Sequence, residues 1–192
     1  MCGHGVPAAL IASMIKVATQ AANGCASHPA QVLRSVGSIL NKNVRGQLVS
    51  AAYLWIDMEA RTATYSAAGH PPLVRWRKGM ALLHASRAMA YCSVSTLSLN
   101  IRSATSPLLA GDRFLLYTDG VTEPENQVGQ QFGESRLEQI MRDNQSRSVS
   151  EFSELLPAEI RAWQPSNVAQ QDDITVILVD VLESVKLQPR PA

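Results

Sequence analysis

Cysteine is scarce in this chain, and the few copies are not arranged for cross-linking or for zinc. The 192 residues include three cysteines, Cys2, Cys25 and Cys92, an odd number without CxxC spacing. Disulfide frameworks need paired cysteines, and zinc sites use closely spaced ones. The sequence therefore argues against a disulfide-stapled domain and against a zinc knuckle. We expect a reducing, cytoplasmic location.

An excess of charge of one sign and a long apolar run are also lacking. Lys and Arg number 17 and Asp and Glu number 16, which leaves a net charge of +1. This balance provides no general electrostatic attraction for nucleic acid or for an anionic membrane. The apolar run 6–15 ends at Lys16, and no run approaches the roughly 18 apolar residues of a membrane span. We predict no nucleic-acid partner and no membrane partner.

The hydrophobic pattern predicts one domain over 1–183 and a disordered tail over 184–192. Helical spacing predicts two helices early in the chain and two later ones, the last opened by a capping box of Ser148 and Glu151. Strand-like runs lie between and after them, and segment 88–106 has no clear pattern. The predicted helices cover 7–22, about 28–43, 134–143 and the stretch from 148; the predicted strands cover 49–58, 62–66, 73–77, 80–84, 113–118 and 174–181, the last as a central strand. This order indicates an α+β layered domain.

Two aspartates occupy positions where carboxylates can converge. Asp119 follows a buried strand, and Asp172 with its neighbour Asp173 precedes another, so adjacent strands would bring them to one sheet edge. Oxygen ligands without a His or Cys cluster favour Mg²⁺ or Mn²⁺. Taken alone, the Asp119-Gly120 pair and the Asp172-Asp173 pair are more often ordinary turn residues, so both interpretations stay open.

Glycine-rich turns provide weaker candidates. Gly3, His4 and Gly5 precede a predicted helix, where free backbone N–H groups can face a phosphate. A plain helix-entry turn explains the same residues equally well. His4 is a weak candidate for a proton donor, whereas turn structure is the better interpretation of His70.

The sequences of four segments, and their order along the chain, resemble one known family. These segments are 3–10 (GHGVPAAL), 68–73 (AGHPPL), 116–123 (LYTDGVTE) and 172–176 (DDITV). The sequence resembles the PPM superfamily of metal-dependent protein phosphatases (type 2C), in its SpoIIE/RsbU-like bacterial branch, from Met1 to about Val181.

The resemblance implies two antiparallel β-sheets sandwiched between helical layers, with a binuclear Mn²⁺ or Mg²⁺ centre at one edge. Asp119 and Asp172 match metal ligands of the family, and Asp173 is a neighbour of the site. Gly3, Gly5 and Gly120 match the loops beside the metals and the phosphate. A metal-activated water would hydrolyse phosphoserine or phosphothreonine on a regulatory protein, such as an anti-sigma factor antagonist.

The resemblance also implies segments ahead of Met1. Family members have an Asp-Val pair before the GHG turn, the Asp bridging both metals, and Met1 stands at the position of the Val. We expect a truncated domain that lacks the first strands, exposes apolar strand edges, and follows a sensory domain in a longer form. The alternative function is a catalytically impaired fragment or pseudophosphatase that acts as a binding module.

Overall fold

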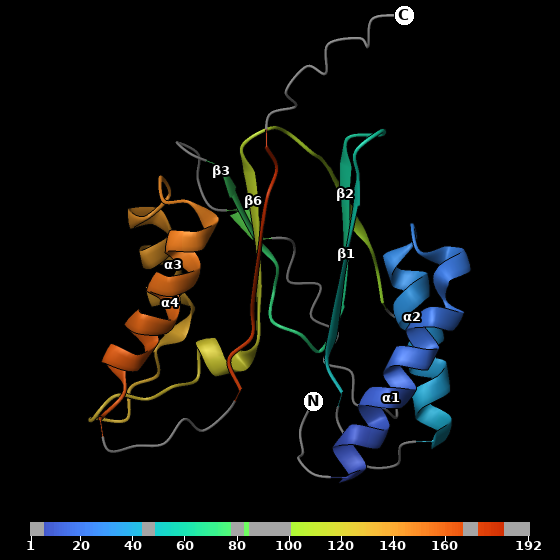
Figure 1. The fold of residues 1–192 in the computed structure, drawn as a ribbon, viewed down its shortest axis with the longest axis horizontal. Helices are drawn as coiled ribbons and strands as arrows, with labels where there is room; N and C mark the ends of the chain where they lie inside the picture. The colour runs from blue at the N-terminus through green and yellow to red at the C-terminus, as the bar shows by residue number, and fades with distance from the viewer. Residues whose placement is uncertain (1–5, 44–48, 78–82, 85–100, 167–172, 183–192) are drawn as a thin grey trace, which may run out of the picture. The chain divides into compact units, whose positions relative to one another are not determined.

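The structure is a computed structural model, which describes residues 6–43, 49–77, 83–84, 101–166 and 173–182. The chain divides into two compact units. Unit 1 consists of Met1–Pro72 and Ala85–Pro107, and unit 2 consists of Leu73–His84 and Leu108–Ala192. Each unit combines a helix pair with an antiparallel sheet (Figure 1).

Unit 1 begins with the helices α1 (Val6–Ala21) and α2 (Pro29–Asn43). Its sheet has the order β1-β2-β5, and all pairs are antiparallel. The strands are β1 (Ala51–Asp57), β2 (Thr62–Ala68) and β5 (Ala104–Pro107). Apolar residues at helical spacing on α1 and α2 form one core cluster with residues of β2 and its neighbours. The guanidinium of Arg34 on α2 donates to the carbonyl of Ile101 at 2.7 Å, which fixes the approach to β5.

Unit 2 is built on a sheet of order β4-β3-β6-β7, again antiparallel. The strands are β3 (Val74–Arg77), β4 (Leu83–His84), β6 (Asp112–Tyr117) and β7 (Val176–Asp180). The helices α3 (Gly133–Asp143) and α4 (Val149–Trp163) pack their apolar faces on this sheet. Phe152 of α4 contacts Trp76 of β3 with ring centroids 6.0 Å apart, so the largest side chains form the centre of this core.

The predicted α+β class with two antiparallel sheets and helices is confirmed. The capping box that opens α4 is present, because the Ser148 side chain accepts from the Glu151 N–H while the Glu151 carboxylate accepts from the Ser148 N–H. One strand was missed: β5 falls largely in the segment that has no clear pattern, because its sequence, ATSP, is short and three of its four residues are exposed. It forms because Tyr65 and its neighbours on β2 supply a ladder for it.

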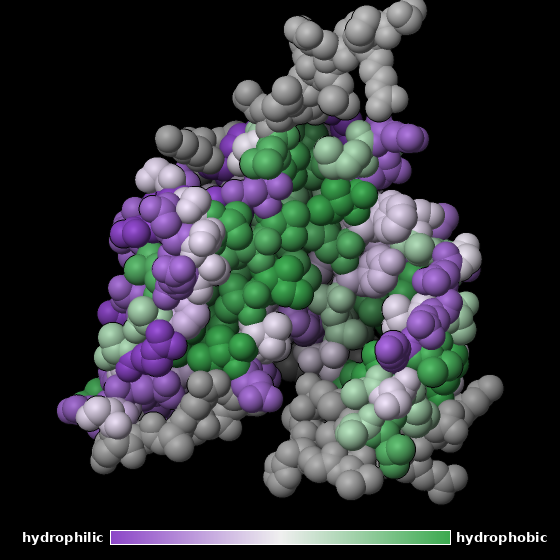
Figure 2. Space-filling view, viewed as in Figure 1, coloured by the Kyte–Doolittle hydropathy of each residue, from purple (hydrophilic) through white to green (hydrophobic). Residues whose placement is uncertain are grey.

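The prediction of a central last strand is wrong for the described sheet. Among the described strands β7 pairs only with β6, and Ile177 is 51% exposed. Figure 2 shows hydrophobic side chains gathered over β7. Every residue of β1, the first strand of the other sheet, is likewise only partly buried. Among the described strands, β1 and β7 are therefore each an outermost strand of their sheet, and β7 exposes the apolar side chain of Ile177.

No helix among the described residues is both long and apolar enough to cross a membrane.

Candidate functional site

The candidate site begins where the most buried strand of unit 2 ends. Phe114, Leu115 and Tyr117 hold β6 in the core, and the chain then passes through Thr118 into a single 3₁₀ turn, η2 (Asp119–Val121). Val121 is fully buried in the core of unit 2, and it anchors the turn there. A buried strand and a buried turn residue therefore fix the position of the Asp119 backbone between them.

The backbone of Asp119 organises the turn, whereas its side chain remains exposed. The Asp119 carbonyl accepts from the N–H groups of Thr122 and Glu123, both at 2.9 Å. The Asp119 carboxylate accepts one hydrogen bond, from the Gly120 N–H at 3.1 Å through Oδ1. The rest of this carboxylate is exposed and therefore accessible to a hard cation.

Thr118 joins this turn to the start of β7. Its hydroxyl donates to the carbonyl of Asp173 at 3.0 Å and accepts from the N–H of Thr175 at 2.9 Å. Its own N–H donates to the Thr175 carbonyl at 3.1 Å, immediately beyond the ladder pair of Tyr117 and Val176. We call these three hydrogen bonds the Thr118 clamp. The clamp brings Asp119 and Asp173 to the same end of the β6–β7 ladder, where the sequence predicts a convergence of carboxylates.

The structure describes three of the predicted site residues and leaves the others outside its described range. Asp119, Gly120 and Asp173 lie at this end of the sheet. The other predicted site residues, Gly3, His4, Gly5 and Asp172, lie outside the described residues. Among the residues that the structure describes, no group of three or more His, Cys, Asp or Glu side chains is arranged to hold a metal ion. The donors that are present carry oxygen alone, which suits Mg²⁺ or Mn²⁺.

The AGHPP segment behaves as a turn in the described structure. Gly69 has a φ of 62°, a left-handed conformation that glycine adopts without strain. The Nδ1 atom of His70 lies 3.0 Å from the carbonyl oxygen of Pro71, a local contact. These contacts agree with the turn interpretation of His70.

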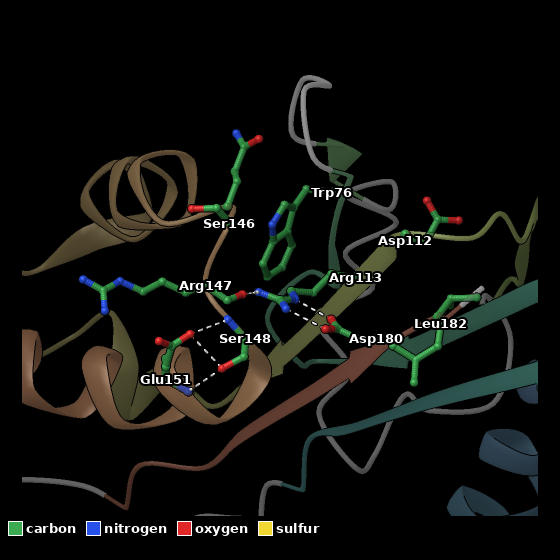
Figure 3. A pocket seen from close by; sticks show the side chains of 12 residues that line it. Trp76, Asp112, Arg113, Ser146, Arg147, Ser148, Glu151, Asp180 and Leu182 are labelled. Atoms are coloured by element: carbon green, nitrogen blue, oxygen red, sulfur yellow. Dashed lines mark hydrogen bonds and ion pairs between the residues drawn. The ribbon is translucent and has the colours of Figure 1, made fainter. Parts of the chain in front are cut away.

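The opposite end of β6 holds a cavity of about 410 Å³ (Figure 3). At 3.3 Å per residue, the start of β6 lies about 20 Å from Asp119. Arg113 is one of the residues that line the cavity. Its guanidinium forms a bidentate pair with Asp180, donates to the Arg147 carbonyl at 2.9 Å and lies over the ring of Trp76. These polar groups satisfy one another, so they stabilise the packing of β6 and β7 on α4 rather than form a reactive site.

Asp112, next to Arg113, is the most buried carboxylate described, at 1% exposure. Arg75 and Arg77 each approach it to 2.5 Å, and the Leu109 N–H donates to it at 2.8 Å. Burial favours the neutral acid, but the hydrogen bonds from Arg75, Leu109 and Arg77 outweigh this effect and lower the pKa of Asp112. The sequence analysis missed this cluster, since its partners lie about 35 residues apart along the chain.

Fold and site together define an α+β protein of two antiparallel sheets, with an acidic 3₁₀ turn clamped to the start of a neighbouring strand. Residues 1–182 match the family model described as Stage II sporulation protein E (SpoIIE), and the chain therefore belongs to the SpoIIE family. The predicted family is confirmed.

Two curated relatives come from Bacillus subtilis (strain 168). The phosphoserine phosphatase RsbU is 26% identical over 179 residues, which cover 92% of this chain and 52% of RsbU. The phosphoserine phosphatase RsbP is 25% identical over 184 residues, which cover 93% of this chain and 43% of RsbP. The chain thus spans about half the length of the curated relatives that it matches.

Solved structures show the same fold. The SiaA-PP2C domain of Pseudomonas aeruginosa matches with a TM-score of 0.79 and 24% identity, over 93% of this chain and 71% of that one. Two further matches were determined in the context of divalent metals. A manganese-presoaked SpoIIE phosphatase domain of Bacillus subtilis has a TM-score of 0.59 and 18% identity, over 79% of this chain and 65% of that one. RsbX in complex with magnesium has a TM-score of 0.60 and 18% identity, over 92% and 75%.

Proposed function

We propose that this chain is a divalent-metal-dependent protein phosphatase domain, extending over 1–183, that hydrolyses phosphoserine or phosphothreonine on a regulatory protein. An anti-sigma factor antagonist is the class of substrate that we favour. Membership of the SpoIIE family and the phosphatase names of RsbU and RsbP support this proposal. The observation that carries it is the Thr118 clamp, which holds the TDG turn beside Asp173 and Thr175.

We assign Asp119 and Asp172 as ligands of a binuclear Mn²⁺ or Mg²⁺ centre, with Asp173 beside them. When bound, such a centre lowers the pKa of a water and offsets the charge of the phosphate. The chain's own residues hold the geometry: the Gly120 N–H orients the Asp119 carboxylate, and the Thr118 hydroxyl fixes the start of β7. The turn with Gly3 and Gly5 is assigned to the phosphate, and His4 to a proton or phosphate contact.

Asp119 suits a cation site because the turn that carries it is anchored in the core. A carboxylate on a turn that is anchored by a buried residue loses little conformational freedom when it binds a cation. The described cysteine, Cys25, is a free thiol in unit 1, which suits the reducing cytoplasm that we propose.

The test is hydrolysis of a phosphoserine peptide by the full chain with Mn²⁺ or Mg²⁺. We expect Asp119→Asn and Asp172→Asn each to lower kcat/KM about 100-fold or more, because each removes a charged ligand. Asp143→Asn is the matched control, since Asp143 is exposed on α3 and only accepts from the Gln139 amide. Chelation with EDTA should abolish turnover, and re-addition of metal should restore it.

Three outcomes are distinguishable. Loss of activity in both site variants but not in the control supports the metal centre. Full activity of Asp119→Asn contradicts it. Tight binding of the phosphopeptide by a folded chain without turnover in either metal favours the alternative, a binding module.

A further inference from the structure

Helix α3 of unit 2 begins at a residue that is hydrogen-bonded to the segment following the TDG turn. The carbonyl of Thr122, directly after η2, accepts from the N–H of Gly133 at 2.9 Å, and Gly133 is the first residue of α3. Arg136 follows within the first turn of that helix. The side chain of Arg136 is therefore carried by an element whose start is bonded to the segment that follows Asp119.

The guanidinium of Arg136 lies over two aromatic rings. Its Cζ atom is 4.0 Å from the ring centroid of Trp163 and 5.8 Å from that of Phe132. The two rings meet edge to face at 87°, with centroids 6.2 Å apart. Phe132 is buried and the Trp163 Nε1–H donates to the Gln130 carbonyl at 3.1 Å, so the platform itself is fixed. A cation–π contact of this kind attracts the guanidinium to the ring without using its N–H donors.

Those donors have no acceptor in the described structure. Arg136 is exposed, and among the described residues it forms neither an ion pair nor a hydrogen bond. The other arginines of unit 2 that stack on rings differ in this respect: Arg75 is paired with Asp112 and Arg113 with Asp180. A positive charge that is oriented but unpaired is complementary to an anionic group on another molecule.

The neighbouring loop extends this surface with an apolar tip. The side chain of Asn126 accepts from the N–H groups of Val128 and Gln130, both at 3.0 Å, and the Phe132 N–H donates to the Pro124 carbonyl at 2.8 Å. Val128 at the tip is 83% exposed. Arginine and tryptophan are the residue types enriched in binding hot spots, and here they lie on the same surface as an exposed apolar residue.

We infer that Arg136, stacked on Trp163, is a specificity site that binds a carboxylate of an acidic segment in the phosphoprotein substrate. This inference rests on the proposed function, since it adds a second substrate contact on the helix whose first residue is bonded to the segment that follows Asp119. Nucleic acid is a less suitable occupant, because the chain as a whole has a net charge of only +1.

The experiment uses the full chain and a panel of synthetic phosphoserine peptides. One peptide has neutral flanks, and the others carry a pair of glutamates at increasing distance on either side of the phosphoserine. We expect at least one acidic peptide to have a KM roughly fivefold lower than the neutral peptide, the upper range for a single exposed charge contact. Arg136→Gln should remove this difference and leave hydrolysis of para-nitrophenyl phosphate unchanged.

The matched control is Arg161→Gln. Arg161 is an exposed arginine in the last turn of α4, two positions from Trp163, and no stacking ring lies beneath it among the described residues. Trp163→Ala keeps the charge of Arg136 but removes its platform, and it should reduce the preference as well. Near-ultraviolet circular dichroism of each variant shows whether the core of unit 2 is intact.

The outcomes separate this inference from the proposed function. A preference that Arg136→Gln abolishes and Arg161→Gln preserves supports the site. The absence of any acidic preference in the unsubstituted chain, or an equal loss in both variants, overturns it. If no phosphate substrate is hydrolysed, the proposed enzyme fails, and binding of the same peptides by fluorescence anisotropy in EDTA decides on the Arg136 site by the same comparison.

Discussion

Replacing Thr118 by valine tests whether the clamp serves the proposed metal centre. Valine has nearly the shape of threonine and suits the extended conformation of Thr118, so the substitution removes little besides the hydroxyl. Two hydrogen bonds are lost: the one donated to the Asp173 carbonyl at 3.0 Å and the one accepted from the Thr175 N–H at 2.9 Å. The backbone bond from the Thr118 N–H to the Thr175 carbonyl remains.

The size of the effect follows from these two bonds. A hydrogen bond contributes a net 0.5–1.5 kcal/mol or so, and Thr118 is only partly buried, so water replaces part of what is lost. We expect the free energy of unfolding to fall by about 1–2 kcal/mol. If the same free energy holds the two acidic segments in place for a cation, Mn²⁺ affinity should fall by about 5- to 30-fold, since 1.4 kcal/mol is about tenfold.

Two assays measure these quantities on the same protein. Urea unfolding gives the change in stability, and isothermal titration calorimetry gives the affinity for Mn²⁺. Thr118→Ser retains the hydroxyl and should differ from the unsubstituted chain by less than about 0.5 kcal/mol. Thr64→Val removes a hydroxyl that pairs with the Thr105 hydroxyl in the sheet of unit 1, and it should leave Mn²⁺ affinity unchanged.

One result would refute the reasoning. If Thr118→Val loses stability as expected but binds Mn²⁺ and turns over substrate as the unsubstituted chain does, the clamp is a structural bond with no role in the site. An unchanged stability would show instead that water fully replaces the hydroxyl.

Further predictions concern the opposite end of the sheet and the start of α4. Asp112→Asn should lower stability at pH 7 by about 2–4 kcal/mol, because the partly buried Arg75 and Arg77 lose a buried counter-charge. The folded pKa of Asp112 is lowered, so its contribution is present above its unfolded pKa and is lost as the pH falls through the folded pKa; urea unfolding from pH 7 to pH 2.5 should show the variant and the unsubstituted chain converging, and parallel curves would contradict the assignment. Ser148→Ala removes the cap of α4 and should cost about 1 kcal/mol in the same assay, whereas Ser153→Ala, whose hydroxyl only bonds the Ser150 carbonyl within that helix, should cost less than half as much.

The elements of the fold follow closely from local sequence patterns. The apolar spacing of α1 and α2, the capping box of α4 and the continuous apolar run of β6 are each encoded within a few residues. Such features depend on side chains near one another in the chain, so the sequence predicts them directly. The prediction failed for β5, whose four residues have little strand preference of their own and pair because β2 is adjacent in space.

The family motifs likewise assign Asp119 and the DDIT segment to the proposed site from the sequence, since the order of the motifs is itself the signal. The structure shows that the two motifs, which are far apart in the sequence, meet at one end of the β6–β7 ladder. Only the antiparallel pairing of β6 and β7 brings Thr118 to Asp173 and Thr175, across more than fifty positions of sequence. Hydrogen bonds of that kind have no local signature, because the same threonine can bond water equally well in an isolated strand.

The sequence by itself determined the family, the class of fold, most helices and strands, and the acidic residues of the proposed site. Tertiary structure alone decided that β7 lies at the edge of the described sheet, that Asp112 is buried between two arginines, and that Arg136 lies over Trp163 without an ion pair among the described residues. The physical reason is the range of the interactions: backbone preference and apolar periodicity act over a few residues, whereas strand order, ion pairing and ring stacking depend on which distant segments the packed core brings together.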